Sequence, residues 1–331
     1  MKKILLSLLA LCAASSLWAV KFQSGLLHYN TLAGDSTVEV AFQNSSKINY
    51  SDLTAVSIPE TVTYNSKTYT VVAIGSKAFA GCPTFDSIPN TSYSNTTLKL
   101  INIPKTVKTI DKYAFYNCTA LTTINFLGDG LERIGRFAFR GCTALKSFYF
   151  PQTLKEIGSY AFSSSALAGD IIIPENVTSI GNNAFVSTQM TTLSIGNSVS
   201  TISESAFQSC YSLTSVTLGN SVATIGESAF NSCSSLTSIT LPKSVKTIQR
   251  NAFAGCSKLT TVYLKPTTPP YFSYTDILPS TAKTFYVPCG ASETYFLSDW
   301  IAFTTDFQEE ECIKKYTIYV NQDCTSSVVE E

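Results

Sequence analysis

The sequence predicts a β-rich solenoid, a right-handed stack of about ten rungs of about 23 residues with one parallel sheet and a cap at each end. An Ala-Phe pair recurs at steps of 36, 24, 23, 23, 22, 23 and 23 residues. Each copy also contains a short stretch in which apolar and polar residues alternate, which is typical of a half-buried strand. A unit this short can bury its apolar face only against its neighbours. Stacking is therefore expected.

The chain begins with the pattern of a secretory signal peptide over residues 1–19. Lys2 and Lys3 precede an apolar stretch from Ile4 to about Ala14, and a small residue, Ala19, precedes the expected cleavage point. The apolar stretch is too short for a membrane-spanning helix. Cleavage removes two of the 23 basic residues and none of the 23 acidic ones, so the mature chain should carry a net charge of about −2 and no transmembrane segment.

Residues 20–50 are expected to form an N-terminal cap, because the open end of a stacked sheet has to be covered. The apolar side chains expected to build this cap are Phe22, Leu26, Leu27, Tyr29, Val38, Val40 and Phe42.

The solenoid itself is expected over residues 51–290. In the copy at 236–242, Ile239 and Leu241 alternate with hydroxyl residues, so both should point inward. Equivalent strands are expected at about 53–59, 98–104, 121–127, 145–151, 168–174, 190–196, 213–219, 259–265 and 282–288. Pro or Gly ends most of these strands.

After each strand, a V-x-x-I step predicts a short second strand on an opposite wall, as at Val222 and Ile225. An I-G-x-x-A-F stretch then turns the chain, with Ala allowing close approach and Phe filling the interior. Eight phenylalanines should therefore form one continuous stack: Phe79, Phe115, Phe139, Phe162, Phe185, Phe207, Phe230 and Phe253.

A small side chain stands three residues after each of these phenylalanines. In six copies it is cysteine: Cys82, Cys118, Cys142, Cys210, Cys233 and Cys256. Ser165 and Thr188 occupy the same site in the other two copies, so the site favours a small, mostly buried group that donates one weak hydrogen bond to a loop carbonyl. We expect unpaired thiols here, although neighbouring rungs lie within disulfide distance.

The combination I-G-x-x-A-F-x-x-C-x-x-L-T-x-[IV]-x-[LIF]-P, nearly complete around Phe139, Phe230 and Phe253, resembles the BspA-like (treponemal-type) leucine-rich repeats and covers about residues 53–288. The resemblance implies an exported or surface-exposed protein of the kind found in anaerobic bacteria. It also implies adhesion to host matrix proteins, host cells or other microbes. It carries over no defined set of binding residues.

Two regions depart from the repeat. The first step contains about 13 extra residues, 84–96, and such an insertion can be a tolerated loop or part of a binding face. Residues 291–331 are expected to form a C-terminal cap and tail. Within them, Tyr295, Phe296, Trp300 and Phe303 should close the last rung from a short helix-like segment at 291–303, and one strand is expected at 316–320 before a polar, acidic tail. Cys289, Cys312 and Cys324 allow one disulfide in three ways, and a bridge from the last rung to the tail is favoured.

No residue pattern indicates catalysis, a metal or a cofactor. The chain has one histidine, His28, and its carboxylates are scattered singly, so neither a catalytic triad nor a paired-carboxylate site is predicted. The glycines stand singly, so no phosphate-binding loop is expected. Equal numbers of acidic and basic residues without a basic patch argue against a nucleic-acid partner.

A binding face is the better candidate. One outward position of the main sheet reads Ser57, Asn102, Asn125, Tyr149, Ile172, Ser194, Thr217, Thr240, Tyr263 and Tyr286. Tyr149, Ile172, Tyr263, Tyr286, Asn102 and Asn125 are the candidate contact residues, since tyrosine is enriched where proteins meet partners. Cross-strand pairing that supports the sheet explains the tyrosines equally well.

We therefore expect an exported protein, at the cell surface, outside the cell or in the periplasm, that binds a protein or glycan of host or microbial origin. The alternative is a passive structural component of the cell envelope without a soluble ligand.

Overall fold

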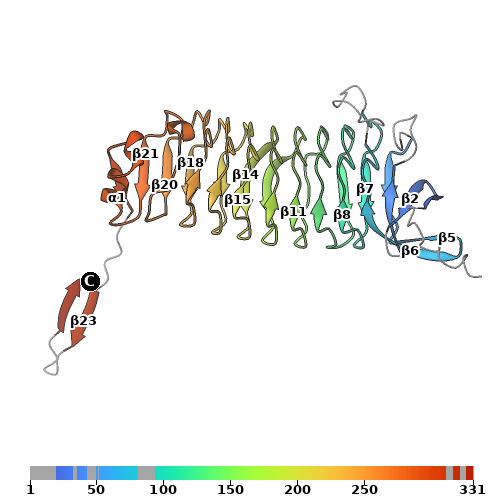
Figure 1. The fold of residues 1–331 in the computed structure, drawn as a ribbon, viewed down its shortest axis with the longest axis horizontal. Coiled ribbons are helices and arrows are strands. Elements are labelled where there is room, and N and C mark those ends of the chain that lie inside the picture. Colours follow the sequence, from blue (N-terminus) through green and yellow to red (C-terminus); the bar gives the residue numbers. More distant parts are fainter. Residues whose placement is uncertain are drawn as a thin grey trace, which may run out of the picture.

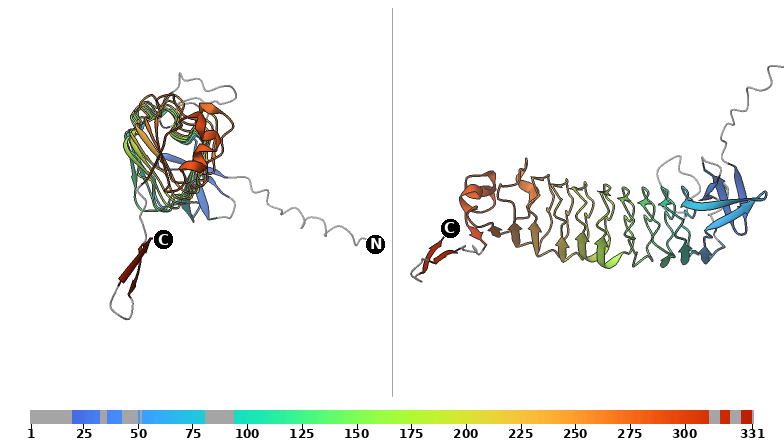
Figure 2. Two further views of the ribbon diagram at one scale, coloured as in Figure 1. Left: turned by 90° about the vertical axis from the view of Figure 1, so that its left-hand side faces the viewer. Right: turned by 90° about the horizontal axis from the view of Figure 1, so that it is seen from below.

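The protein is a stack of similar turns. The computed structural model describes residues 20–32, 36–42, 50, 52–80, 94–310, 316–320 and 326–330, and Figure 1 shows the turns following one another along a single long axis. Viewed along that axis, the turns superimpose into one closed outline (Figure 2). About nine turns form the stack. The predicted β-rich solenoid with parallel, stacked strands is confirmed. The predicted signal peptide, Cys82 and most of the 84–96 insertion lie outside the described residues.

The main wall consists of parallel strands in three hydrogen-bonded groups. They are β4 (Ala55–Ser57), β7 (Leu100–Ile103) and β9 (Thr123–Phe126); β12 (Ala168–Ile173), β14 (Gln189–Ile195) and β16 (Ser215–Thr217); and β18 (Ser238–Leu241), β20 (Thr261–Leu264), β21 (Thr284–Val287) and β22 (Phe307–Glu309). Residues at equivalent repeat positions lie opposite one another, as Ile239 does opposite Val262. The alternation of apolar and hydroxyl residues therefore places one set of side chains inside and the other outside.

The strand predicted at 145–151 does not form. Within the described chain, no backbone hydrogen bond joins residues 147–150 to a neighbouring rung. Phe148 and Phe150 stand where most rungs carry Ile, Leu or Val. Phe126 and Phe285 are single exceptions in rungs that do form strands, and no other rung has Phe at both positions. The Phe148 ring lies 4.9 Å from that of Phe162. Two rings need more room than two aliphatic side chains, so they hold this rung out of register with the ladder.

The second wall is made of short strands at the V-x-x-I steps, as predicted. It begins with β6 (Lys67–Ile74) and continues through β8 (Thr109–Ile110), β10 (Arg133–Ile134), β11 (Glu156–Ile157) and β13 (Ser179–Ile180). A further group contains β15 (Thr201–Ile202), β17 (Thr224–Ile225) and β19 (Thr247–Ile248). In each described pair the isoleucines of successive repeats lie opposite one another.

Each fully described turn between the walls contains two residues in the left-handed backbone region. In one repeat they are Ser228 (φ 55°), which precedes the Ala-Phe pair, and Ser232 (φ 62°), which follows it. The N–H of each Phe except the last then donates to the carbonyl of the Ala one repeat further on, as from Phe230 to Ala252 at 2.8 Å, and Phe253 donates to the carbonyl of Ile277. The turns are therefore a third hydrogen-bonded ladder.

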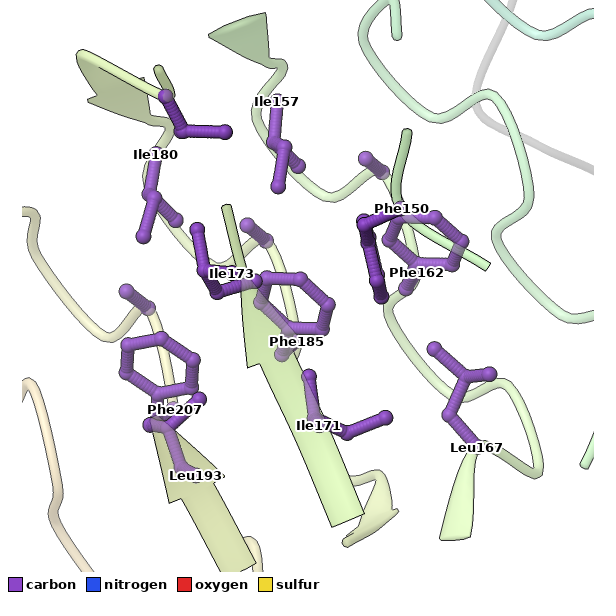
Figure 3. Close-up of a cluster of buried hydrophobic side chains, with 14 of the residues drawn as sticks. Phe150, Ile157, Phe162, Leu167, Ile171, Ile173, Ile180, Phe185, Leu193 and Phe207 are labelled. Carbon is purple, nitrogen blue, oxygen red and sulfur yellow. The ribbon is translucent and has the colours of Figure 1, made fainter. Parts of the chain in front are cut away.

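Phenylalanine rings fill the interior between the walls. All eight repeat phenylalanines are fully buried, and successive rings stack with centroids 5.0–5.4 Å apart and planes within 10° of parallel. Figure 3 shows Phe162, Phe185 and Phe207 in one file, with Ile171 and Ile173 from the main wall close to them. The ring file occupies the volume that neither wall alone could fill.

A file of buried thiols runs beside the rings. The described thiols at this site, those of Cys118, Cys142, Cys210, Cys233 and Cys256, are free. Each donates to the carbonyl oxygen of the Phe in the preceding repeat at 3.1–3.3 Å. Thr188 Oγ1 instead donates to the carbonyl of Phe185 in its own repeat, and Ser165 Oγ is buried without a partner. Cysteine reaches across one rung, which the shorter serine side chain does not.

An antiparallel meander covers the N-terminal end. It contains β1 (Lys21–Ser24), β2 (Leu27–Thr31) and β3 (Thr37–Ala41), and β3 pairs in parallel with β6, which also forms a hairpin with β5 (Thr61–Tyr64). Phe22, Leu27, Tyr29, Val38 and Val40 are buried as expected. The expectation was wrong for Leu26, which is 68% exposed in the turn between β1 and β2, and Phe42 is only half-buried.

The C-terminal end is closed by α1 (Ser292–Phe296) and a 3-10 turn at Asp299–Ala302. Tyr295 and Trp300 are buried, and each donates to a backbone carbonyl at 2.8 Å, Tyr295 to Pro266 and Trp300 to Pro270. Phe303 packs partly buried against the core, as predicted. Phe296 does not close the rung, because it is largely exposed beside Leu297.

Beyond the last rung, β23 (Tyr316–Val320) pairs antiparallel with β24 (Ser326–Glu330). The first strand was predicted, but the second was taken for a polar tail. Cys289 is disulfide-bonded; Cys312 and Cys324, the residues considered as its partners, lie outside the described residues.

Removing one ring of the file should be costly. We expect Phe230→Ala to lower the free energy of unfolding by about 3–5 kcal/mol, because the cavity lies between two walls that cannot collapse without breaking their ladders. Denaturant unfolding followed by circular dichroism measures the loss. The exposed Thr217→Ala is the control, with an expected change within about 0.5 kcal/mol, and equal effects of the two variants would contradict the stacked core.

The thiol file should make stability depend on pH in the alkaline range. Burial raises the pKa of the Cys142 thiol from 9.0 to about 12 and that of Cys210 to about 11. The contribution of these thiols is complete below the unfolded pKa of about 9 and is lost as pH rises towards about 11–12, because only the unfolded chain ionises them readily.

We therefore expect wild-type protein in oxygen-free buffer to lose more unfolding free energy between pH 8 and pH 10.5 than the C142S/C210S variant. The comparison cancels the titration of buried tyrosines, which both proteins share. Parallel pH curves would show that the thiols do not contribute.

Candidate binding face

The outward row of the main wall is formed by Ser57, Asn102, Asn125, Tyr149, Ile172, Ser194, Thr217, Thr240, Tyr263 and Tyr286. Within each group of strands the members lie opposite one another: Ser57, Asn102 and Asn125 in the first, Ile172, Ser194 and Thr217 in the second, and Thr240, Tyr263 and Tyr286 in the third. Tyr149 stands in the rung without a strand. All members are exposed or half-buried.

The two asparagines hydrogen-bond along the row. Asn125 Nδ2 donates to Asn102 Oδ1 at 2.9 Å, and Asn102 Nδ2 donates to Ser57 Oγ at 2.8 Å. Side-chain amides so engaged offer fewer free donors and acceptors to a partner. The hydrogen bonds of these side chains therefore mainly link β4, β7 and β9 to one another.

Tyr263 and Tyr286 also face each other. Their rings stack with centroids 4.9 Å apart and planes 11° from parallel, and both side chains are half-buried. Much of their apolar surface is therefore already covered, as in a cross-strand aromatic pair that supports a sheet.

Tyr149 and Ile172 differ from the rest of the row. Tyr149 is 55% exposed and Ile172 is 64% exposed, and Leu127, just past the end of β9, is 59% exposed. Tyr149 Oη donates to Asp129 Oδ1 at 3.3 Å, and desolvation followed by the charge of Asp129 raises the pKa of Tyr149. We call Leu127, Tyr149 and Ile172 the apolar patch. The repeat pattern did not reveal Leu127, which stands where several copies have Pro.

The apolar patch borders the interrupted rung. The bulky Phe148 and Phe150 point inward there, and Tyr149 between them is turned to solvent. The exposed aromatic side chain therefore lies in the rung where the ladder is interrupted.

A shallow groove of about 580 Å³ lies further along the main wall, between the ends of β16 and β18. These two strands belong to different hydrogen-bonded groups. Val216, Leu218 and Pro242 contribute apolar surface to the groove, and Lys243 and Lys265 stand at its rim. Lys265 forms an ion pair with Glu310.

The residues that could carry chemistry are dispersed. His28 lies in β2, and burial, together with the charge of Lys21, lowers its pKa. Asp170 accepts a hydrogen bond from Thr192 at 2.6 Å on the main wall, and Glu204 lies in a turn of a later repeat. Across the described parts of the chain, no group of three His, Cys, Asp or Glu side chains could hold a metal ion. In the same residues no helix has the length and apolarity to cross a membrane.

Comparisons with known proteins agree with this architecture. A model of the "BspA type Leucine rich repeat region" matches residues 86–214 and 178–275, with six copies, and so covers more than half of the 331 residues. A leucine-rich repeat protein of T. pallidum is 25% identical, with a TM-score of 0.52 over 66% of this chain and 91% of that one. One from Bacteroides ovatus is 25% identical, with a TM-score of 0.35 over 88% and 100%. No curated protein matches the chain.

The two kinds of tyrosine should respond differently to one substitution. Tyr263→Thr removes a stacked ring and should cost about 0.5–1.5 kcal/mol beyond the loss of buried area. Tyr149→Thr should change the free energy of unfolding by no more than about 0.5 kcal/mol. Thr240 shows that the row accepts threonine, so strand propensity affects both variants alike. Equal losses in denaturant unfolding would mean that Tyr149 also supports the sheet.

Proposed function

Since this chain belongs to the BspA-type leucine-rich-repeat family, we propose that it is an exported surface protein that binds a macromolecular partner through the outward face of its main wall. The expected partner is a host matrix protein, a host cell-surface molecule or the surface of another microbe. The protein acts by presenting a rigid surface and catalyses no reaction.

The apolar patch is the observation that carries this proposal. Three large apolar side chains are more than half exposed on successive rungs, while most of the row consists of hydroxyl and amide groups. Exposed apolar residues grouped within a polar surface mark interaction sites, because their burial by a partner releases water. An aromatic residue beside two aliphatic ones is also the composition of many interface hot spots.

Among the six contact candidates, Tyr149 and Ile172 are therefore the central ones. Asn102 and Asn125 take part as the polar rim on one side. Tyr263 and Tyr286 form a separate surface four to five rungs beyond Ile172, and their mutual stacking gives them less free area to contribute.

Export follows from the signal-peptide pattern of residues 1–19, and surface exposure is what a protein needs to meet a host or microbial partner.

A passive role in the envelope is the second candidate. It is supported by the side-chain bonds within the row itself, the asparagine ladder and the tyrosine stack, which suit a spacer that resists bending.

Binding assays can separate the two. We expect purified residues 20–331 to bind at least one of immobilised fibronectin, laminin, collagen or mucin. The Y149S/I172T variant should bind that probe at least about tenfold more weakly, a loss of roughly 1.4 kcal/mol. Serine and threonine are native to this row at Ser194 and Thr217, so the variant should keep its fold.

The control is Y211S/L297T, which removes a similar amount of exposed apolar surface elsewhere. It should change affinity less than about twofold. Equal losses in both variants would reject the apolar patch as the contact. Failure of the wild-type protein to bind any probe, together with self-association in solution, would favour the passive role.

A further inference from the structure

Three consecutive turns carry an aromatic side chain at a position that does not favour one. Tyr113, Phe137 and Tyr160 precede the Ala-Phe pair in their repeats and have φ of 61°, 59° and 58°. Their rings stack, with centroids 5.0 Å apart between Tyr113 and Phe137 and 4.8 Å between Phe137 and Tyr160. We call these three residues the aromatic ridge. It lies on the turns between the walls, away from the outward row.

The backbone at this position is left-handed in every described repeat. Four of the other copies have Asn183, Ser205, Ser228 and Asn251 there, with φ between 53° and 59°. Asparagine tolerates this region, whereas a bulky side chain is disfavoured in it. The ridge therefore opposes local backbone preference three times in succession. Packing offsets part of this cost, because Phe137 is buried with Ala80 and Tyr116, and Tyr113 and Tyr160 pack against this cluster. The same packing fixes the rings in place beneath the side chains that lie over them.

Two arginines lie over the ridge. The guanidinium carbon of Arg136 is 4.6 Å from the ring centroid of Phe137, and that of Arg140 is 5.5 Å from the same ring and 5.8 Å from that of Tyr160. Contact with a ring face orients a guanidinium plane but uses none of its five donors. Neither guanidinium forms a hydrogen bond or ion pair with any described residue. The rings thus hold two guanidinium groups at the surface whose donors face solvent and not other described side chains.

The turns of the first two ridge repeats carry three cations. Lys112 and Arg136 stand two residues before the Ala, and Arg140 follows the Phe in the second of these repeats. Further along the stack the position two before the Ala is held by Glu204 and Glu227 and then by Arg250, which is paired with Asp276. A chain with 23 basic and 23 acidic residues has no overall attraction for a polyanion, so the cations at the ridge form a local site.

We propose that the aromatic ridge with Lys112, Arg136 and Arg140 binds an acidic polysaccharide that carries carboxylate or sulfate groups. Guanidinium forks match both anions in a bidentate geometry. Successive rungs are about 5 Å apart, close to the advance of a linear polysaccharide per sugar ring, so anions along such a chain meet cations on neighbouring rungs. Successive residues of an extended peptide advance only about 3.3 Å each, which does not match the spacing of the rungs.

This site is separate from the apolar patch. The ridge site lies on the turns and binds a charged carbohydrate. The apolar patch lies on the main wall and buries apolar surface against its partner. The protein can therefore hold a sugar polymer and another macromolecule at different faces.

The test uses purified residues 20–331 and four polymer probes: heparin, polygalacturonate, polyglutamate and uncharged dextran. Wild-type protein should bind heparin or polygalacturonate, and more tightly than polyglutamate, with no binding to dextran. The R136Q/R140Q variant should lose about tenfold or more in affinity, and its dependence on salt should be shallower. K246Q/K258Q removes the same charge from two exposed lysines elsewhere and should bind like the wild type.

A second variant tests the rings. F137N/Y160N installs the residue that Asn183 and Asn251 already provide at this backbone position, so the turn should form normally. It leaves both arginines in place but removes their support, and affinity for the bound polysaccharide should fall severalfold with an unchanged circular dichroism spectrum. The Y149S/I172T variant should bind the polysaccharide as well as the wild type, which separates this site from the proposed sheet-face contact.

Equal losses of affinity in R136Q/R140Q and K246Q/K258Q would overturn the proposal, because binding would then depend on net charge and not on the ridge. So would equal binding of polyglutamate, which would make the partner an acidic protein. If the wild-type protein bound neither acidic polysaccharide, the whole proposal would be wrong. If F137N/Y160N bound with wild-type affinity, the rings would have no part in binding.

Discussion

Every rung of this protein has to match the spacing that backbone hydrogen bonds impose on its neighbours. The two walls and the turns are all ladders. Within each group of strands equivalent residues of successive repeats lie opposite one another, and in the turns an N–H donates to the carbonyl of the residue that precedes its equivalent one repeat further on. Interior side chains must then repeat at the same interval. Planar rings satisfy this requirement. They stack with centroids 5.0–5.4 Å apart, which matches the spacing of the rungs. The Ala before each Phe is small enough to let consecutive turns approach to hydrogen-bonding distance.

The same constraint explains the cysteines. A thiol reaches the carbonyl of the preceding rung, occupies little volume and stays neutral when buried. Serine at position 165 occupies the site without a partner, and threonine at 188 bonds within its own rung and to the Cys210 thiol of the following one. Neither substitute bonds to the Phe carbonyl of the preceding rung, as cysteine does. The preference for cysteine is thus a consequence of reach and of the low cost of burying a thiol, with no need for redox chemistry.

Recurrence made the architecture predictable. Phe230, Cys233 and Ile239 stand at the same offsets in copy after copy, and a position that recurs in a stack is one that its neighbours constrain. The structural effect of residues that differ from the repeat could not be predicted in this way. Phe148 and Phe150 fit the apolar pattern of a strand, yet their combined volume prevents one. The outward pattern also showed four aromatic or aliphatic exceptions without showing that Tyr263 and Tyr286 cover each other while Tyr149 and Ile172 do not. Leu127 was missed because it is a single residue in a position usually held by Pro.

Backbone conformation carries the information that the one-letter pattern lacks. Tyr113, Phe137 and Tyr160 read as unremarkable variable residues until their positive φ places them among asparagines and serines. A variable position in a solenoid is ordinarily free to take whatever its local geometry favours. Three adjacent copies have a residue type that the left-handed backbone disfavours. The energetic cost of that backbone conformation has to be offset by contacts along the stack or by a ligand. The rings contact one another and the buried Tyr116, and they also hold two arginines that have no partner among the described residues. Recognition by this fold thus depends on neighbouring copies deviating together, since a single deviating rung presents only about 5 Å of surface.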